Sequence, residues 1–332
     1  MAENGILSIK FGVSKQLKDK KILIIGFGMI GSRHAQSLLD SGYKNISIID
    51  ENHKNIEKGL DVIGYSKSDV KVIKSTDDIK NHIHDIAIIA TSASPRFEIY
   101  KNLLSANIKK FLLEKVVFQS DSQFKIALGL EKKAGAIAFC NFPNRYFDNY
   151  INLKRQISKI KDHIVMSVNA GDCGMGCSGI HYLDLFEYLT NSSINYSESI
   201  LKEWTKDNKR GKYYTDFSGL FFASNDKNHT LKINFDKSHE GPCNVDISFK
   251  HNQVILYEGQ ELEYRLVESK KLVNDFSIIP QSKLTSKILN DIFLNKCLMP
   301  TINQVSNSHS HLFKECNAAI KSHRNGEICP IT

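Results

Sequence analysis

The sequence predicts an α/β protein with two parts, an N-terminal doubly wound parallel sheet and a C-terminal α+β region with a large, mostly antiparallel open sheet. A short apolar run at residues 22–25 leads directly into Gly26, Gly28 and Gly31, which places a glycine-rich turn between a strand and a helix. Short apolar runs then alternate with helical segments, as in a parallel sheet. Residues 204–266 instead hold alternating apolar and polar segments, which favour antiparallel strands.

The glycine-rich turn has the G-x-G-x-x-G spacing of a dinucleotide-binding Rossmann fold. Gly26 allows a tight turn, Gly28 lets the backbone approach a pyrophosphate, and Gly31 lets the helix pack close to the strand. Met29 and Ile30 lie beside the helix N-terminus, which supplies unpaired N–H groups and partial positive charge. The turn predicts dinucleotide binding, and a strand–helix turn that binds nothing is the alternative.

An acidic residue follows the second predicted strand. Residues 45–49 form that strand, and Asp50 comes directly after it. A carboxylate in this place accepts hydrogen bonds from both ribose hydroxyls and repels a 2′-phosphate, so it favours NAD over NADP. Glu51 adds to the repulsion, whereas His53 and Lys54 weaken the preference.

The remaining N-terminal segments alternate between helix and strand. The sequence predicts helices over residues 32–39, 52–60, 96–105 and 122–133, and strands over residues 70–73, 86–90, 111–113 and 136–140. Thr91, Ser92 and Ala93 follow one central strand, and Glu114 and Lys115 follow the next. Because ligands of such sheets bind outside the carboxyl ends of the strands, we expect these five residues to contact the cofactor.

The C-terminal part begins after the sixth predicted strand. We expect helices over residues 150–160, 286–295 and 305–322, a helical run opened by His181, and strands over residues 164–168, 231–235, 245–249, 253–259 and 262–267. Residues 170–179 are expected to form a glycine-rich loop. The predicted domains are an NAD-binding domain at 1–145, with an N-terminal extension at 1–20, and a substrate-binding and oligomerisation domain at 146–332 whose last helix packs back.

Composition excludes several classes of protein. The chain has 332 residues, 41% hydrophobic and 24% charged, which is ordinary for a globular protein. No apolar run is long enough to span a membrane, and the N-terminus lacks a signal-peptide layout, so we expect a cytoplasmic protein without membrane contact. The net charge of +8 comes from dispersed lysines without a basic, aromatic-interleaved block, which argues against nucleic-acid binding.

The cysteines indicate a reduced, intracellular set. Seven are present, scattered and odd in number, without a C-x-x-C pair. Cys173, Cys177 and His181 resemble part of a metal site, but no second ligand pair accompanies them. We therefore expect no metal.

Six sequence blocks together resemble the glucose–fructose oxidoreductase/inositol dehydrogenase/MocA family of NAD(P)-dependent sugar oxidoreductases. The blocks are GFGMIGSRH (26–34), ATSAS (90–94), LLEKVV (112–117), NFPNRY (141–146), GIHYLDL (179–185) and MPT (299–301). Their order and spacing extend the resemblance over nearly the whole chain. The resemblance implies an NAD cofactor, a small sugar-type substrate, and a homo-dimer or homo-tetramer.

The same resemblance implies two catalytic residues. Lys115 matches the lysine of the family's E-K-P block, where this chain has Val116 in place of proline. Its ammonium can hydrogen-bond the reacting hydroxyl, and His181 can accept and return the proton because imidazole titrates near neutrality. The alternatives are a lysine that only reaches solvent from a strand end and a histidine in a half-buried helix start.

Four further residues are predicted to bind substrate. Asp184 lies one helical turn after His181, and Asn141 and Arg145 follow the sixth strand. Arg145 suits a substrate carboxylate or phosphate, or else it pairs with an acid across the interface between the two predicted domains. Cys177 stands where the family commonly has an aspartate, and a thiol does not replace a carboxylate as an acceptor.

The predicted function is an NAD-dependent oxidoreductase that transfers a hydride between nicotinamide and a sugar, sugar acid or nucleotide sugar. The segment GDCGMGCSGIHYLDL and the ending CPIT resemble a subgroup associated with bacterial surface-polysaccharide biosynthesis. Two alternatives stay open: a non-catalytic NAD-binding regulator or partner subunit, and a lyase or hydrolase that retains its NAD.

Overall fold

The computed structural model forms two compact units, which are described separately. Unit 1 comprises Met1–Thr91, Ile108–Phe111 and Pro280–Leu298, and unit 2 comprises Ser92–Asn107, Leu112–Ile279 and Met299–Thr332. The structure describes residues 15–171, 173–204, 211, 213–236, 238–239, 243–249, 252–258, 278–320 and 328–332. The predicted NAD-binding domain at 1–145 and substrate-binding domain at 146–332 stay predictions, because compact packing does not show which residues bind a ligand.

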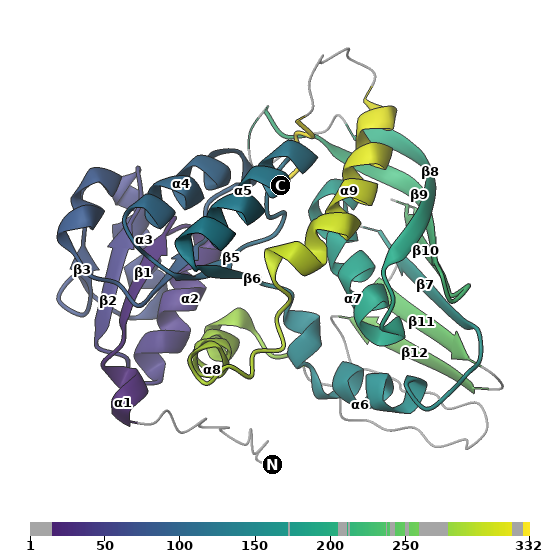
Figure 1. Cartoon of the computed structure of the whole chain (residues 1–332), viewed down its shortest axis with the longest axis horizontal. Coiled ribbons are helices and arrows are strands. Elements are labelled where there is room, and N and C mark those ends of the chain that lie inside the picture. Colours follow the sequence, from purple (N-terminus) through teal and green to yellow (C-terminus); the bar gives the residue numbers. More distant parts are fainter. Residues whose placement is uncertain are drawn as a thin grey trace. The chain divides into compact units, whose positions relative to one another are not determined.

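The first sheet has the strand order β3-β2-β1-β4-β5-β6 (Figure 1). Its strands are β1 Lys21–Ile25, β2 Asn45–Ile49, β3 Lys71–Val72, β4 Ile86–Ile89, β5 Lys110–Leu113 and β6 Ile137–Cys140. Strand β1 pairs in parallel with both β2 and β4, with Ile22 opposite Ile46 and Ile86. The strand order reverses at β1, so the predicted doubly wound Rossmann sheet is confirmed.

The helices of unit 1 are α1 Lys15–Lys18, α2 Met29–Asp40, α3 His53–Ile63, the 3-10 helix η1 Thr76–Asn81, and α8 Gln281–Phe293. Helix α3 begins where the Asn52 side chain accepts from the Lys54 N–H and ends at Gly64, whose φ is +75°. Although α8 lies late in the sequence, it packs against α2, with His34 Nδ1 2.8 Å from Thr285 Oγ1.

The helices of unit 2 are α4 Ala93–Ser105, α5 Asp121–Ala134, the 3-10 helix η2 Pro143–Tyr146, α6 Asp148–Ile157, the π-helical turn η3 Met175–Gly179, α7 Ile180–Thr190 and α9 Ile302–Ala319. Ser120 caps α5 through the Gln123 N–H, and Thr301 and Gln304 form a capping box at the start of α9. Side-chain oxygens thus satisfy N–H groups at both helix starts.

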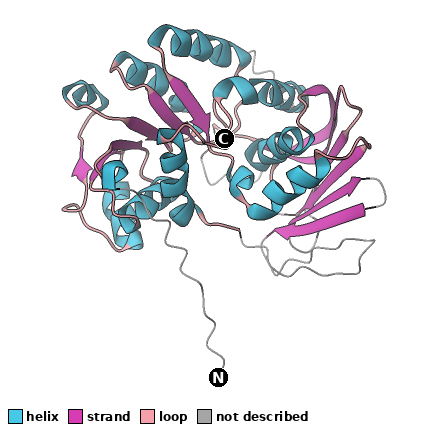
Figure 2. Ribbon diagram, turned by 60° about the horizontal axis from the view of Figure 1, so that its bottom comes forward, coloured by secondary structure: helices cyan, strands magenta, loops and turns pink. Residues whose placement is uncertain are grey.

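The second sheet lies within unit 2 and has the order β12-β11-β7-β10-β9-β8. Its strands are β7 Ile164–Ala170, β8 Ile194–Trp204, β9 Asp216–Asn225, β10 Thr230–Phe235, β11 Cys243–Phe249 and β12 Asn252–Glu258. Among the described strands of this sheet, β7 and β10 alone pair in parallel, so the predicted mostly antiparallel sheet is confirmed. Helices α7 and α9 lie along one face of this sheet (Figures 1 and 2).

Several elements differ from the sequence predictions, among them β8, η3 and α4. Strand β8 was not predicted, because its outward residues include Glu198 and Lys202 and hide the alternation of an edge strand. The predicted loop at residues 170–179 ends in the π-helical turn η3. Helix α4 begins at Ala93, three residues before its predicted start.

Other predicted segments cannot be compared. The strand predicted at 262–267 and most of the N-terminal extension lie outside the described residues. Among the described helices, none combines the length and apolar character needed to cross a membrane.

Candidate functional site

Two of the three glycines in the unit 1 turn have no room for a side chain. Gly26 has φ +85°, and a Cβ built there would lie 2.8 Å from the backbone of Ala90. A Cβ at Gly31 would overlap the carbonyl oxygen of Gly26. The turn is therefore tight, and helix α2 starts directly against strand β1.

The third glycine faces open space. A Cβ at Gly28 would meet no atom within 4 Å, although its φ of −71° suits any residue. Gly28 is the N-cap of α2 and offers no side chain to satisfy the first N–H groups, while Met29 is 77% exposed. An accessible helix N-terminus next to an open glycine fits the pyrophosphate of NAD.

Asp50 is fixed by three hydrogen bonds from its own unit. Its Oδ2 accepts from the Phe27 N–H at 2.6 Å, and its Oδ1 accepts from the Asn52 N–H at 2.8 Å and from Asn55 Nδ2 at 3.0 Å. The carboxylate thereby joins the end of β2 to the glycine turn. Its remaining lone pairs can still accept from a ribose hydroxyl.

In unit 2, Lys115 is held against the turn before α7. Its Nζ donates to the Cys177 carbonyl oxygen at 2.9 Å and lies 3.5 Å from Cys177 Sγ. The ammonium is only partly buried. Both predicted residues are thus in contact, although the thiol takes part only weakly.

Arg96 clamps the segment that carries Lys115. Its side chain is 1% exposed, and Nη1 donates to the carbonyl oxygens of Glu114, at 2.7 Å, and Val116. From α9, His309 Nε2 accepts from the Val117 N–H at 3.2 Å. The segment is therefore fixed from two helices, α4 and α9, and no local sequence pattern predicts these contacts.

Glu114 faces Asn141. The Asn141 Nδ2 donates to Glu114 Oε1 at 2.6 Å, and both side chains are buried. The backbone N–H of Asn141 also donates to the Leu113 carbonyl oxygen. Glu114 and Asn141 therefore support each other, and their predicted roles toward cofactor and substrate stay predictions.

A partly buried carboxylate lies in the turn that contains Cys177. Asp216, the first residue of β9, accepts from the Gly176 N–H at 2.7 Å and from its neighbour Phe217 at 2.9 Å. A Cβ at Gly174 would overlap this carboxylate, so glycine is required there. Burial raises the pKa of Asp216, while backbone N–H groups, including that of Cys177, oppose the rise.

Asp216 is the main site residue that sequence reasoning missed. It acts on Lys115 through the turn: its oxygens bind the N–H groups of Gly176 and Cys177, and the carbonyl of Cys177 accepts from the lysine. The signal available in the sequence was the density of glycines at residues 171–179. The partner residue itself lies about forty positions on.

His181 opens α7, with its ring 5.6 Å from that of Phe142. Burial lowers the pKa of His181 to about 3, and the positive charge of Lys115 adds to this effect, whereas Glu114 opposes it. The imidazole is therefore neutral at physiological pH and has a lone pair that can accept a proton.

Arg145 and Asp184 form a two-pronged ion pair. Arg145 Nε donates to Asp184 Oδ2 at 3.0 Å, and Nη2 donates to Oδ1 at 2.7 Å. Asp184 is completely buried, which raises the pKa of its carboxyl, while Arg145 opposes the rise. The pairing matches the alternative in which Arg145 binds an acid of this chain, and substrate contact by either residue stays a prediction.

The start of α4 is tied to the end of the chain. The Ala93 N–H donates to Thr332 Oγ1 at 3.0 Å, and the Ser94 N–H donates to the Tyr214 hydroxyl at 3.2 Å. Ser92 is exposed as the N-cap of α4, and Thr91 is the last residue of its segment of unit 1.

The structure groups the predicted site residues by unit. Unit 1 brings together the glycine turn and Asp50, and unit 2 brings together the contacts around Lys115 and those around Arg145. Within the described parts of the chain, no group of three or more His, Cys, Asp or Glu is arranged to hold a metal ion.

Solved structures share this fold. An oxidoreductase from Agrobacterium radiobacter in complex with NAD+, L-tartaric acid and magnesium has a TM-score of 0.71 and 12% identity, covering 92% of this chain and 97% of its own. UDP-N-acetylglucosamine 3-dehydrogenase from Acidithiobacillus ferrooxidans gives 0.71 at 14% identity, covering 90% and 97%. A putative myo-inositol dehydrogenase from Sinorhizobium meliloti gives 0.69 at 13% identity, with the same coverage.

A family model matches residues 20–142, and its description is an oxidoreductase family with an NAD-binding Rossmann fold. The matched segment contains the glycine turn, Asp50 and Lys115. This result confirms the predicted family, its NAD cofactor and its oxidoreductase chemistry. Residues 20–142 thus match the model of the glucose–fructose oxidoreductase/inositol dehydrogenase/MocA family.

Proposed function

We propose that the protein oxidises a hydroxyl group, or reduces the matching carbonyl, on a sugar, sugar acid or nucleotide sugar. The observation that carries the proposal is that unit 2 holds a neutral imidazole, His181, together with the ammonium of Lys115. The charge of Lys115 helps to lower the pKa of His181. A neutral imidazole and an ammonium are the acceptor and donor that alcohol oxidation requires. The names of two structural neighbours, a UDP-N-acetylglucosamine dehydrogenase and a putative myo-inositol dehydrogenase, support the substrate class.

In the proposed reaction each group of the chain has one role. His181 accepts the hydroxyl proton, and Lys115 donates a hydrogen bond to the same oxygen, which stabilises negative charge as it develops. NAD, when bound, accepts or supplies the hydride. The N–H groups at the start of α2 hold its pyrophosphate, and Asp50 orients a ribose.

Asp216 is proposed as a positioning residue. It keeps the Cys177 carbonyl aimed at Lys115, so the ammonium is presented in a defined direction instead of sampling many rotamers. In this chain Asp216 thereby supplies a carboxylate to the turn in which relatives commonly have an aspartate at the position of Cys177.

The test is a panel of sugars, sugar acids and nucleotide sugars assayed for NADH formation, followed by Lys115→Met and His181→Asn on any substrate found. Each variant should lower kcat about 10²- to 10⁴-fold, as loss of a general acid or base does. Lys125→Met, which removes an exposed lysine of α5, is the matched control and should change kcat less than about twofold. Full activity in both site variants would reject the proposed roles.

A non-catalytic NAD-binding regulator is the second candidate. It is favoured by the contact of Lys115 with the carbonyl and thiol of Cys177, since an ammonium already bound by the chain need not meet a substrate. A regulator should bind NADH with normal affinity in both site variants and show no turnover on the panel. Net NADH formation with any substrate would exclude it, and would also exclude an NAD-retaining lyase or hydrolase as the sole activity.

The oligomeric state, the cellular location and the pathway are also part of this proposal. The face of the second sheet away from α7 and α9 exposes Val165, Tyr196 and Ile200, which supports a homo-dimer or homo-tetramer. Light scattering of the protein and of Ile200→Glu tests this, because a monomeric protein would contradict it. A cytoplasmic location and a role in surface-polysaccharide synthesis rest on the sequence alone.

A further inference from the structure

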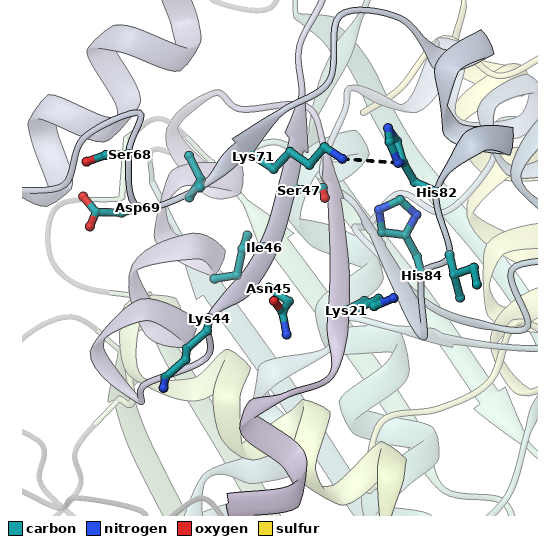
Figure 3. Close-up of a pocket in the computed structure, with 12 residues that line it drawn as sticks. Lys21, Lys44, Asn45, Ile46, Ser47, Ser68, Asp69, Lys71, His82 and His84 are labelled. Atoms are coloured by element: carbon teal, nitrogen blue, oxygen red, sulfur yellow. Dashed lines mark hydrogen bonds between the residues drawn. The ribbon is translucent and has the colours of Figure 1, made fainter.

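Unit 1 has a concave surface at the edge of its sheet that lies opposite the glycine turn. Its walls come from the amino ends of β1 and β2, from β3 and from the residues just before β4, and it encloses about 560 Å³ (Figure 3). Because parallel strands all begin at the same edge, this pocket and the turn after β1 face opposite ends of the sheet. The proposed oxidoreductase chemistry does not use it.

The pocket is lined by an excess of basic groups. Lys21, Lys44 and Lys71 contribute three ammonium groups, and His82 and His84 contribute two imidazoles. Lys71 Nζ reaches His82 Nδ1 at 3.2 Å, and Figure 3 shows the His84 ring beside this pair. Lys71, His82 and His84 therefore lie together in one wall, whereas Lys44 lies apart from them.

The two carboxylates near the pocket, those of Asp69 and Asp85, already accept hydrogen bonds from other groups. Asp69, the acidic residue of the lining, accepts from the Ser66 N–H and hydroxyl at 2.8 and 2.9 Å. Asp85 accepts from Lys20 Nζ at 3.1 Å and from the Lys21 N–H at 2.8 Å. In the described part of the chain no carboxylate pairs with the ammonium of Lys21 or Lys71.

His84 supplies an independent sign of a missing ligand. Its side chain lines the pocket and is only 9% exposed, yet Nδ1 has no hydrogen-bond partner among the described residues. Burial, together with the charges of His82, Lys71 and Lys21, lowers the pKa of His84 to about 4, although Asp85 opposes the shift. A buried polar atom without a partner, in a field of uncompensated positive charge, is accounted for by a bound anion.

We propose that this pocket binds a phosphate group, either as free phosphate or as the phosphate of a small ester. Lys21 and Lys71 provide the charge, and His84 and the Ser47 hydroxyl provide hydrogen-bond donors. Several donors from different elements suit a tetrahedral oxyanion with oxygens in several directions. The volume exceeds that of phosphate alone, and the 80% exposed Ile83 at the lining offers an apolar contact for the organic part of an ester.

The test is calorimetric titration of the full chain with inorganic phosphate and with glycerol 3-phosphate, at about 0.15 M salt and with saturating NADH present. Saturating NADH keeps the probes off the glycine turn, and salt at this level screens diffuse surface charge. We expect saturable binding of a phosphate probe and none of glycerol. A higher affinity for the ester assigns an esterified ligand, and a higher affinity for phosphate assigns the free anion.

Two matched variants locate the binding. Lys71→Met should weaken phosphate binding about tenfold or more, since a charge-assisted hydrogen bond is lost, while leaving NADH affinity unchanged. Lys58→Met removes an exposed lysine of α3 outside the pocket and should have no effect. Absence of binding of both phosphate probes, or an equal loss in the two variants, would overturn the proposal.

Discussion

The glycine turn at residues 26–31 and the one at residues 174–179 each join a strand to a helix, but they differ in what faces the glycines. In unit 1, Gly28 faces open space. In unit 2, Gly174 faces the carboxylate of Asp216, which accepts N–H groups of the turn. In the first turn Asp50 binds the Phe27 N–H, but the start of α2 has no side-chain cap and stays available to an anion from solution. The second turn instead binds a carboxylate of its own chain at its helix start.

The same difference extends to the other charges of the two units. Unit 2 neutralises its buried acid Asp184 with Arg145. Unit 1 leaves Lys21 and Lys71 without a carboxylate in the described chain and keeps its helix N-terminus accessible. Glycine spacing therefore marks a place where backbone N–H groups meet an anion, and it does not tell whether that anion is a ligand or a side chain.

Arg145→Met gives the largest expected change in stability. It leaves Asp184 buried without its partner, which should lower the free energy of unfolding by about 3–5 kcal/mol. Urea denaturation measures the loss. Unchanged stability together with a lower kcat/KM would instead assign Arg145 to the substrate. It would contradict the statement that unit 2 neutralises its buried acid internally.

A pair of glycine variants tests the comparison directly. Gly174→Ala places a methyl group where the carboxylate of Asp216 lies, and should lower the free energy of unfolding by about 2–4 kcal/mol through loss of charged hydrogen bonds. Gly28→Ala meets no atom and has a permitted φ, so its loss should stay below about 0.5 kcal/mol. Thermal and urea unfolding of both variants measure the difference, and equal losses would contradict it.

Asp216→Asn should have a smaller effect, because it keeps the shape and removes the charge. We expect a loss of about 1–3 kcal/mol in stability and a displaced pH profile of kcat/KM, since Lys115 depends on the turn that Asp216 holds. Asp61→Asn, at an exposed position of α3, is the control. A purely structural role would lower stability and leave the pH profile of the remaining activity in place.

Acid destabilisation is predicted from one buried histidine of α9. His309 is buried and neutral, with Nδ1 2.8 Å from the Val305 carbonyl oxygen, and burial lowers its pKa to about 3. The unfolded chain takes up this proton near pH 6.5 and the native chain does not. Stability is therefore complete above that pH and falls by about 1.4 kcal/mol per pH unit between about 6.5 and 3.

Urea unfolding at pH 7, 6 and 5 measures this slope. The variant His309→Gln should reduce the slope by the contribution of one proton. An unchanged slope in that variant would show that another group takes up the proton, and His181, whose pKa is also lowered to about 3, would then be substituted next.

The sequence predicted the first sheet well because its signals are local. The β1 run, the glycine spacing and Asp50 lie within about thirty residues, and each has one physical reason. Strand β8 was missed because the charged residues Glu198 and Lys202 interrupt the apolar residues of its outer face. Helix α8 was placed by sequence position although it packs in unit 1.

Lys115 and His181 were named from their own sequence blocks, and their catalytic roles stay predictions. Asp216, Arg96 and His309 instead act from distant elements through backbone groups. A contact between a side chain and a distant peptide group leaves no pattern in one sequence. Arg145 and Asp184 were both predicted to bind substrate, and pairing of Arg145 with an acid was the alternative interpretation.

The central claim is that the unit 1 turn binds NAD because no side chain caps the start of α2. Fluorescence titration with NADH of the unsubstituted protein and of Gly28→Ala tests it most directly. We predict saturable binding that weakens about tenfold or more in the variant, because a methyl group in the path of the pyrophosphate costs about 1–3 kcal/mol. Equal NADH affinity in both proteins, or no binding of NADH or NADPH to either, would contradict the claim.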